Sequence, residues 1–181
     1  MLNSAGMSSA HADLASRVRL RAGGFADIAV VQTLAGEIWH RHYPGILSRE
    51  QIEYMLAHGY SHEALSRFVT DDGAGLALAD VDDRAVGFAA WYRVEDATTK
   101  LDKLYVLPEH HGAGVGRTLI EHVASLARER ACTTLTLNVN RNNAYAIRAY
   151  ERCGFTIDSR GDFPIGGGFV MEDFIMEKPL G

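Results

Sequence analysis

The sequence has little cysteine and no long apolar run. Its two cysteines, Cys132 and Cys153, form neither a CxxC pair nor a Cys/His ligand spacing, so we expect reduced thiols and no metal site. No stretch approaches the roughly 18–20 apolar residues that a membrane-spanning helix needs. The first sixteen residues lack the basic and apolar regions of a secretory signal. We therefore expect a cytoplasmic protein that does not bind membranes, with residues 1–16 as a flexible tail.

An excess of positive charge is also missing. The chain has 18 Lys and Arg residues against 23 Asp and Glu residues, which gives a formal net charge of −5. Binding to nucleic acid is therefore disfavoured, because phosphate recognition requires clustered basic side chains. An acidic surface is compatible with a cationic substrate.

The chain has the length and composition of one globular domain. Its 181 residues, 47% of them hydrophobic, are enough to bury a core. Because no internal repeat, low-complexity linker or change of composition divides the sequence, we expect a single domain over residues 17–181.

Hydrophobic periodicity predicts a mixed α/β fold, in the order β-α-α-β-β-β-α-β-α-β-β. The alternating or apolar runs expected to form strands are 17–21, 75–80, 85–93, 101–107, 133–139, 155–157 and 168–177. The helical patterns cover 26–40, a segment that opens after Ser48, a short turn from Ser61 to Phe68, 116–130 and 143–152. Ser48 precedes Gln51 as in a capping box, and Gly154 closes the last helix.

Three alternating glycines, Gly112, Gly114 and Gly116, lie between a predicted strand and a predicted helix in HHGAGVGRTL. They match neither the spacing of a dinucleotide-binding G-x-G-x-x-G nor that of a P-loop. A glycine-rich turn at a helix N-terminus nevertheless presents unpaired amides and the positive end of the helix dipole. We therefore expect this loop to hold an anion such as a phosphate.

A second cluster, NVNRNNAYAIRAYERCGF, spans Asn138 to Phe155. Asn143 opens the predicted helix, and an ordinary N-cap would explain it. Tyr150 follows seven residues later on the same helical face, and the local pattern alone leaves open whether it fills the core or serves a site.

Together the two clusters resemble the GNAT superfamily of acetyl-CoA-dependent N-acetyltransferases. The glycine motif Q/R-x-x-G-x-G/A places Gly114 and Gly116 on its glycines, with His111 as a departure at the Gln/Arg position. The second motif, N-x-x-A-I-x-x-Y-E-x-x-G-F, is matched by Asn143, Ala146, Ile147, Tyr150, Glu151, Gly154 and Phe155. Residues 43–61 and 162–178 are also similar to the branch that includes the PaiA spermine/spermidine acetyltransferase.

The resemblance implies a GNAT-like fold: a central mixed, mostly antiparallel sheet splayed between two parallel strands, with helices on both faces. It implies acetyl-CoA as cosubstrate, with the backbone of Tyr105 and Val106 beside the pantetheine arm and the loop amides on the pyrophosphate. The Thr118 hydroxyl would add a contact. The residues expected to bind the cofactor are Tyr105, Val106, His111, Gly112, Ala113, Gly114, Val115, Gly116, Arg117, Thr118 and Asn143.

The resemblance further implies acetyl transfer by direct attack of an amine in a ternary complex. Tyr150 would protonate the leaving sulfur, and the Val106 N–H would stabilise the oxyanion. Asp102 is the candidate base: it shares a strand face with Lys100, Leu104 and Val106 unless a bulge intervenes, and it could equally be a lysine's partner.

The end of the first helix is where this family builds substrate pockets. We expect Trp39, His40 and Tyr43 there, with His42 as a further histidine, while core packing remains open for Trp39 and Trp91. The acceptor is expected to be a small amine, for which a polyamine is one class. A protein or peptide N-terminus, an aminoglycoside and a non-catalytic acyl-CoA sensor remain alternatives, and a homodimer is expected.

Overall fold

The computed structural model describes residues 17–95 and 97–181, so the predicted tail over 1–16 lies outside the described residues. Seven strands in this part of the chain form one sheet in the order β1-β2-β3-β4-β5-β7-β6. Neighbouring strands are antiparallel except for β4 and β5, which are parallel. The strands are β1 (Arg19–Ala22), β2 (Gly75–Val81), β3 (Arg84–Glu95), β4 (Thr98–Val106), β5 (Thr134–Asn140), β6 (Thr156–Gly166) and β7 (Phe169–Pro179).

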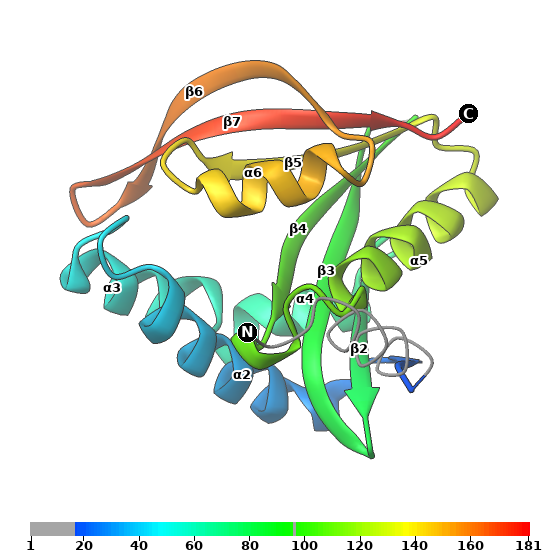
Figure 1. Cartoon of the computed structure of the whole chain (residues 1–181), viewed down its shortest axis with the longest axis horizontal. Helices are drawn as coiled ribbons and strands as arrows, with labels where there is room; N and C mark the ends of the chain where they lie inside the picture. Colours follow the sequence, from blue (N-terminus) through cyan, green and yellow to red (C-terminus); the bar gives the residue numbers. More distant parts are fainter. Residues whose placement is uncertain (1–16, 96) are drawn as a thin grey trace, which may run out of the picture.

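Helices cover both faces of this sheet (Figure 1). They are α2 (Ile28–His42), α3 (Arg49–Gly59), α4 (His62–Thr70), α5 (Val115–Glu129) and α6 (Ala144–Glu151), with short 3₁₀ turns at Phe25–Asp27 and Pro108–His110. Three of them begin at a side chain that accepts a backbone N–H: Ser48 for α3, Ser61 for α4 and Asn143 for α6. These caps fix the helix starts at residues that the sequence already marked.

Two hydrophobic cores lie on opposite faces of the sheet. The α2–α4 core joins α2, α3 and α4 to β2 and β3 and contains Trp39 and Phe88, while the α5 core joins α5 to β3, β4 and β5 and contains Trp91 and Leu137. Both tryptophans are therefore core residues, at 2% and 7% exposure. No helix in the described part of the chain is long and apolar enough to cross a membrane.

The parallel strands β4 and β5 separate soon after they pair. Their register covers only Thr98–Lys100 opposite Thr134–Thr136, and the two strands then diverge (Figure 1). The rest of β4 keeps its partner on the β3 side alone. The expected splay between two parallel strands is thus confirmed, and it leaves a row of β4 backbone groups without a strand partner.

The structure follows the predicted element order except that the short turn expected from Ser61 to Phe68 is a full helix, α4, so that three helices precede β2. One strand is also much longer than expected. We predicted a strand over 155–157, whereas β6 runs from Thr156 to Gly166 and forms a hairpin with β7. Most of its residues are exposed because β6 is an edge strand. It therefore has no buried face to impose the apolar alternation from which strands are predicted.

Candidate active site

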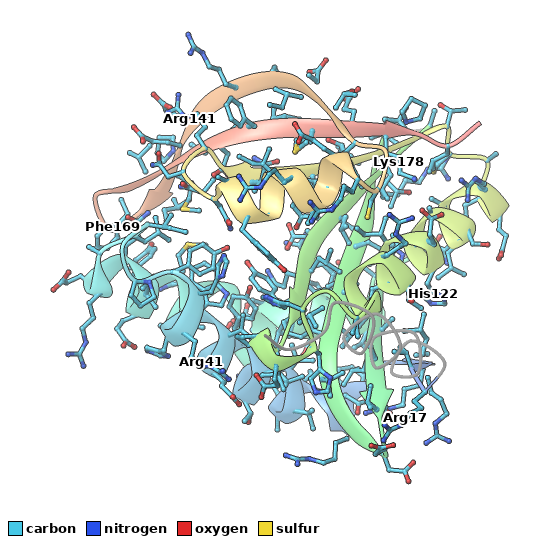
Figure 2. The ribbon with its side chains drawn as sticks, viewed as in Figure 1. Arg17, Arg41, His122, Arg141, Phe169 and Lys178 are labelled. Atoms are coloured by element: carbon cyan, nitrogen blue, oxygen red, sulfur yellow. The ribbon has the colours of Figure 1, made fainter. Side chains whose placement is uncertain are left out.

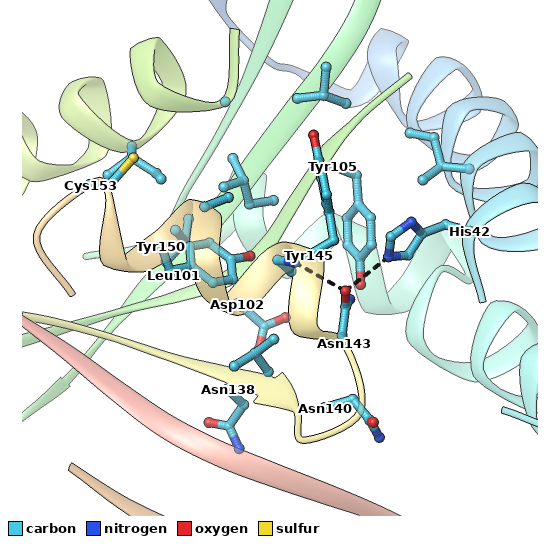
Figure 3. Close-up of a pocket in the computed structure, with 18 of the residues that line it drawn as sticks. His42, Leu101, Asp102, Tyr105, Asn138, Asn140, Asn143, Tyr145, Tyr150 and Cys153 are labelled. Atoms are coloured by element: carbon cyan, nitrogen blue, oxygen red, sulfur yellow. Dashed lines mark hydrogen bonds between the residues drawn. The ribbon is translucent and has the colours of Figure 1, made fainter. Parts of the chain in front are cut away.

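A cavity of about 690 Å³ occupies the splay between β4 and β5. Its walls come from α2, β4, the loop before α5, β5, α6 and the β6–β7 hairpin. Figure 3 shows the side chains of His42, Tyr105, Asp102 and Tyr150 converging on this space. The cavity therefore joins the two sequence clusters that we singled out.

The glycine loop lies at one end of this cavity. Gly112 and Gly114 have φ values of 78° and 85°, the left-handed region in which glycine is unstrained. The first N–H bonded within the helix is that of Thr118, which donates to the Gly114 carbonyl at 2.9 Å. The preceding amides, from Gly112 to Arg117, have no acceptor in the described ranges. Unpaired amides at a helix N-terminus are able to hold an anion.

Not every loop side chain reaches the cavity. Gly112, Gly114, Val115, Gly116 and Arg117 line it, whereas Ala113 and Thr118 do not. The Ala113 side chain is buried in the α5 core. The Thr118 hydroxyl donates to the Gly114 carbonyl at 3.1 Å, so the structure directs it into the helix rather than toward the expected ligand.

His111, the departure from the family motif, lines the cavity and bonds to the strand beside it. Its Nε2 bonds to the Val106 carbonyl at 2.8 Å, and its ring stacks on Tyr145 with centroids 5.3 Å apart. The Leu107 N–H donates to Val86 on β3. Since successive peptide groups of a strand point to opposite sides, the Val106 N–H and carbonyl both face the splay. His111 donates to the Val106 carbonyl, and the Val106 N–H stays available to a ligand.

Tyr150 projects from α6 into the cavity (Figure 3). Its ring packs edge-to-face on Phe155 at 5.7 Å, which holds the ring in place. Its hydroxyl has no hydrogen-bond partner among the described residues, and burial raises its pKa above the ordinary tyrosine value. Tyr150 therefore presents a protonated hydroxyl that is free to donate. Asn143 behaves as an N-cap: its Oδ1 accepts the Ala146 N–H at 3.2 Å.

Asp102 lies on a β-bulge, so it does not share a strand face with Leu104 and Val106 as it would on an unbroken strand. The register on β3 passes from Ala90–Lys103 to Trp91–Leu101 and skips Asp102. Leu101 therefore packs with Leu104 and Val106 in the α5 core, where an unbroken strand would place Lys100. Asp102 lines the cavity, and its Oδ2 accepts a bond from the Lys103 ammonium at 2.9 Å.

The end of α2 supplies aromatic walls, with one correction to the sequence prediction. Trp39 and Tyr43 line the cavity and stack on each other at 4.3 Å. His40 does not line it: the His40 ring lies on the exposed side of α2 and contacts Glu53 at 2.9 Å. His42 lies there instead, and its Nε2–H donates to Asn143 Oδ1 at 3.2 Å. Side chains two residues apart on an α-helix point about 200° away from each other, so the predicted His40 lies on the opposite side of α2 from the cavity.

The far wall of the cavity was missed from the sequence. It is formed by Asn138 and Asn140 of β5 with Asp173 of β7, which pairs with Asn140 in the ladder. One sequence signal could have found it. In FVMEDFIME the acidic residues Glu172 and Asp173 are adjacent, and adjacent residues of a strand face opposite sides, so one carboxylate must face inward.

The β6–β7 hairpin closes the cavity on the side of α3. Tyr54 on α3 donates to the Ile165 carbonyl at 3.1 Å, and Gln51 donates to the Val170 carbonyl at 3.1 Å. Figure 2 shows Phe169, at the turn of the hairpin, beside α3. Its ring lies 5.3 Å from that of Tyr54. Thus α3, from the first third of the chain, and the β6–β7 hairpin, from its last part, meet over the cavity.

Comparisons with known proteins agree with this geometry. The sequence profile of the acetyltransferase (GNAT) family matches residues 36–155. An uncharacterized N-acetyltransferase of Mycobacterium tuberculosis (strain ATCC 25618 / H37Rv) is 30% identical over 137 residues, or 76% of this chain and 87% of that protein. The spermidine N(1)-acetyltransferase of Thermoplasma acidophilum is 26% identical over 165 residues, or 89% of this chain and 96% of that protein.

The fold has a solved counterpart with a bound ligand. The crystal structure of the PaiA N-acetyltransferase from Thermoplasma acidophilum in complex with coenzyme A matches with a TM-score of 0.78 at 26% identity, covering 90% of this chain and 98% of that chain. With the family profile spanning more than half of the sequence, the chain belongs to the acetyltransferase (GNAT) family and is an acetyl-CoA-dependent N-acetyltransferase.

Proposed function

We propose that this acetyltransferase acts on a primary amine of a small molecule, with a polyamine as the leading class, by direct attack in a ternary complex. The observation that carries the proposal is the cavity itself. It runs from the amides before α5, through the splay, to a wall that the β6–β7 hairpin closes against α3. A cavity that extends from the glycine loop to this wall has room for both substrates at once, so the amine can attack without a covalent enzyme intermediate.

The residues fit acetyl-CoA, which supplies the acetyl thioester. The unpaired N–H groups from Gly112 to Arg117 suit its pyrophosphate, and Arg117 itself lines the same end of the cavity. The part of β4 that contains Tyr105 and Val106 has no strand partner on the β5 side, which leaves room for the pantetheine arm beside it. In this assignment His111 positions Val106, Asn143 positions α6, and neither binds the cofactor through its side chain.

The chain's own groups then divide the chemistry among them. The Val106 N–H faces the splay and donates to the oxygen that becomes negative as the amine adds to the carbonyl. The Tyr150 hydroxyl donates its proton to the departing sulfur. Asp102 is our candidate to accept the proton of the amine, because its carboxylate lies in the cavity and Lys103 engages only one of its oxygens.

The closed hairpin favours a small acceptor over a protein. The hairpin contacts α3 through the Phe169 ring and through two hydrogen bonds that α3 side chains donate to hairpin carbonyls, which narrows entry on that side. A folded protein's lysine would need this side open. The spermidine N(1)-acetyltransferase of Thermoplasma acidophilum, which aligns over most of both chains, supports a polyamine.

We also propose a homodimer that uses the outer edge of the sheet. No strand in the described part of the chain pairs with the outer side of β6, and Ile157 on it is 45% exposed. Such an edge commonly pairs with another strand. Light scattering of the purified chain gives the test: a monomer at micromolar concentration would refute it.

Calorimetric titration with acetyl-CoA, first without spermidine and then with it, tests the proposed function. We expect binding in the micromolar range and additional heat of turnover when spermidine is added. Binding without that heat would leave the cofactor site in place and contradict the polyamine. A panel of other small amines and a lysine peptide would then identify the acceptor, and turnover of the peptide alone would overturn the small-molecule proposal.

A further inference from the structure

Asp173 on β7 is a buried carboxylate that is only partly satisfied by the protein. The residue is 6% exposed and lines the far wall of the cavity. Its Oδ2 accepts one long bond from the Asn138 amide at 3.4 Å. Its Oδ1 is buried and has no hydrogen-bond partner in the described ranges. Because buried carboxylate oxygens are normally paired, this atom points to a ligand that donates to it.

The strand register places Asp173 on the opposite face of the sheet from Tyr150. Leu137 and Val139 of β5 pack in the α5 core, which Tyr150 also contacts. Asn138 and Asn140 alternate with them and face the other side, and Asp173 pairs with Asn140. In the view of Figure 3, Asp102 lies between Tyr150 and Asn138. The cavity thus reaches from a reaction centre at the splay to a separate negative group beyond it.

The charges around Asp173 do not neutralise it. Lys100 also lines the cavity and its charge acts on Asp173, but among the described residues no hydrogen bond or ion pair joins the two side chains. Arg141 bonds to Asp162 and lies 3.5 Å from Glu172 on the outer surface. Asp102, the carboxylate on β4 that also lines the cavity, is paired with Lys103. Burial raises the pKa of Asp173, and the Asn138 amide, Lys100 and Arg141 lower it to a smaller extent. Asp173 is therefore the carboxylate of this wall that is left for a cation.

We propose that Asp173 binds a second, non-reacting ammonium group of the acceptor, so that the enzyme prefers diamines and polyamines to monoamines. This inference rests on the proposed function and adds the residue that selects its substrate. The reacting amine must lose its proton at the splay, whereas an amine held at Asp173 stays charged and fixes the orientation of the chain between them. Asn138 positions the carboxylate, and the neutral Asn140 lines the path.

The test compares two amines of matched carbon chain, 1,4-diaminobutane and n-butylamine, with the full-length protein. Release of coenzyme A gives kcat and KM for each amine with wild type, Asp173→Asn and the control Asp158→Asn, which removes an exposed charge on β6. We expect wild type and the control to favour the diamine, and Asp173→Asn to lose at least about tenfold of that preference through KM. The ratio of kcat/KM for the two amines is independent of the folded fraction of each preparation.

The outcomes separate the two proposals. If Asp173→Asn keeps the same ratio as Asp158→Asn, or loses activity on both amines equally, the inference is wrong and the proposed function stands. If wild type binds acetyl-CoA in the calorimeter but acetylates neither amine nor spermidine, the proposed function fails and the inference fails with it.

Discussion

Replacing Tyr150 with phenylalanine removes a single oxygen whose only expected use is catalytic. The hydroxyl has no hydrogen-bond partner among the described residues, and the ring keeps its contact with Phe155 at 5.7 Å in the variant. No buried partner is left unpaired, so the free energy of unfolding should change by less than about 0.5 kcal/mol. Turnover should fall about 10²-fold, or about 2.7 kcal/mol in activation free energy, because the leaving sulfur loses its proton donor.

Three measurements check this prediction. Coenzyme A release gives kcat, calorimetry gives the affinity for acetyl-CoA, and thermal unfolding gives stability. Only kcat should change. Burial raises the pKa of Tyr150, so deprotonation of its hydroxyl should not lower the wild-type kcat up to about pH 10, the ordinary tyrosine pKa.

Tyr60→Phe is the matched control, with the opposite pattern. The Tyr60 hydroxyl is buried outside the cavity and accepts the Trp39 indole N–H at 3.1 Å. Its removal leaves that N–H unpaired, which should cost about 1–3 kcal/mol of stability with a much smaller effect on kcat. A Tyr150→Phe enzyme with kcat within threefold of wild type would remove Tyr150 from the mechanism. Strong destabilisation would show that its role is structural.

Three further predictions follow from the same structure. Gly114→Glu places a negative side chain at φ +85° in the anion site, so calorimetry should detect no acetyl-CoA binding while circular dichroism stays unchanged; normal affinity in a folded variant would contradict the loop assignment. Gly167→Val should collide with Tyr54 and detach the hairpin, which should raise KM for small amines and admit bulkier ones. Gly168→Val, also at a positive φ but with no neighbour within 4 Å, should do neither, and equal effects of the two variants would refute the closure. Asp173→Asn should raise the unfolding temperature at pH 7. Because the pKa of Asp173 is higher in the folded than in the unfolded protein, its contribution to stability is present below the unfolded-state pKa and is lost as the pH rises through the folded-state pKa. A lower unfolding temperature of the variant would show that the Asp173 charge stabilises the fold.

Local chemistry made much of the fold predictable. The helix starts at Ser48, Ser61 and Asn143 follow from side-chain oxygens that cap the next turn, which depends on neighbouring residues alone. The glycine loop was equally local: three alternating glycines predicted a turn before a helix, and Gly112 and Gly114 adopt a positive φ in that turn.

The misses depend on tertiary contacts. The bulge at Asp102 arises from pairing with β3 and leaves no mark in the sequence of β4. The choice between His40 and His42 required the orientation of α2 on the sheet. Asp173 joins the site only because β7 lies beside β5, a pairing between residues distant in the chain.

The short parallel ladder between β4 and β5 divides the sheet into two parts that share three residue pairs. Beyond that ladder the protein carries an internal edge strand, a row of backbone groups able to pair with any extended chain. A pantetheine arm lying there would act as a removable strand that masks this edge. At a free concentration 100 times its dissociation constant, such a ligand adds about 2.7 kcal/mol to the stability. The supply of acetyl-CoA would then govern how readily the protein aggregates as well as how fast it works.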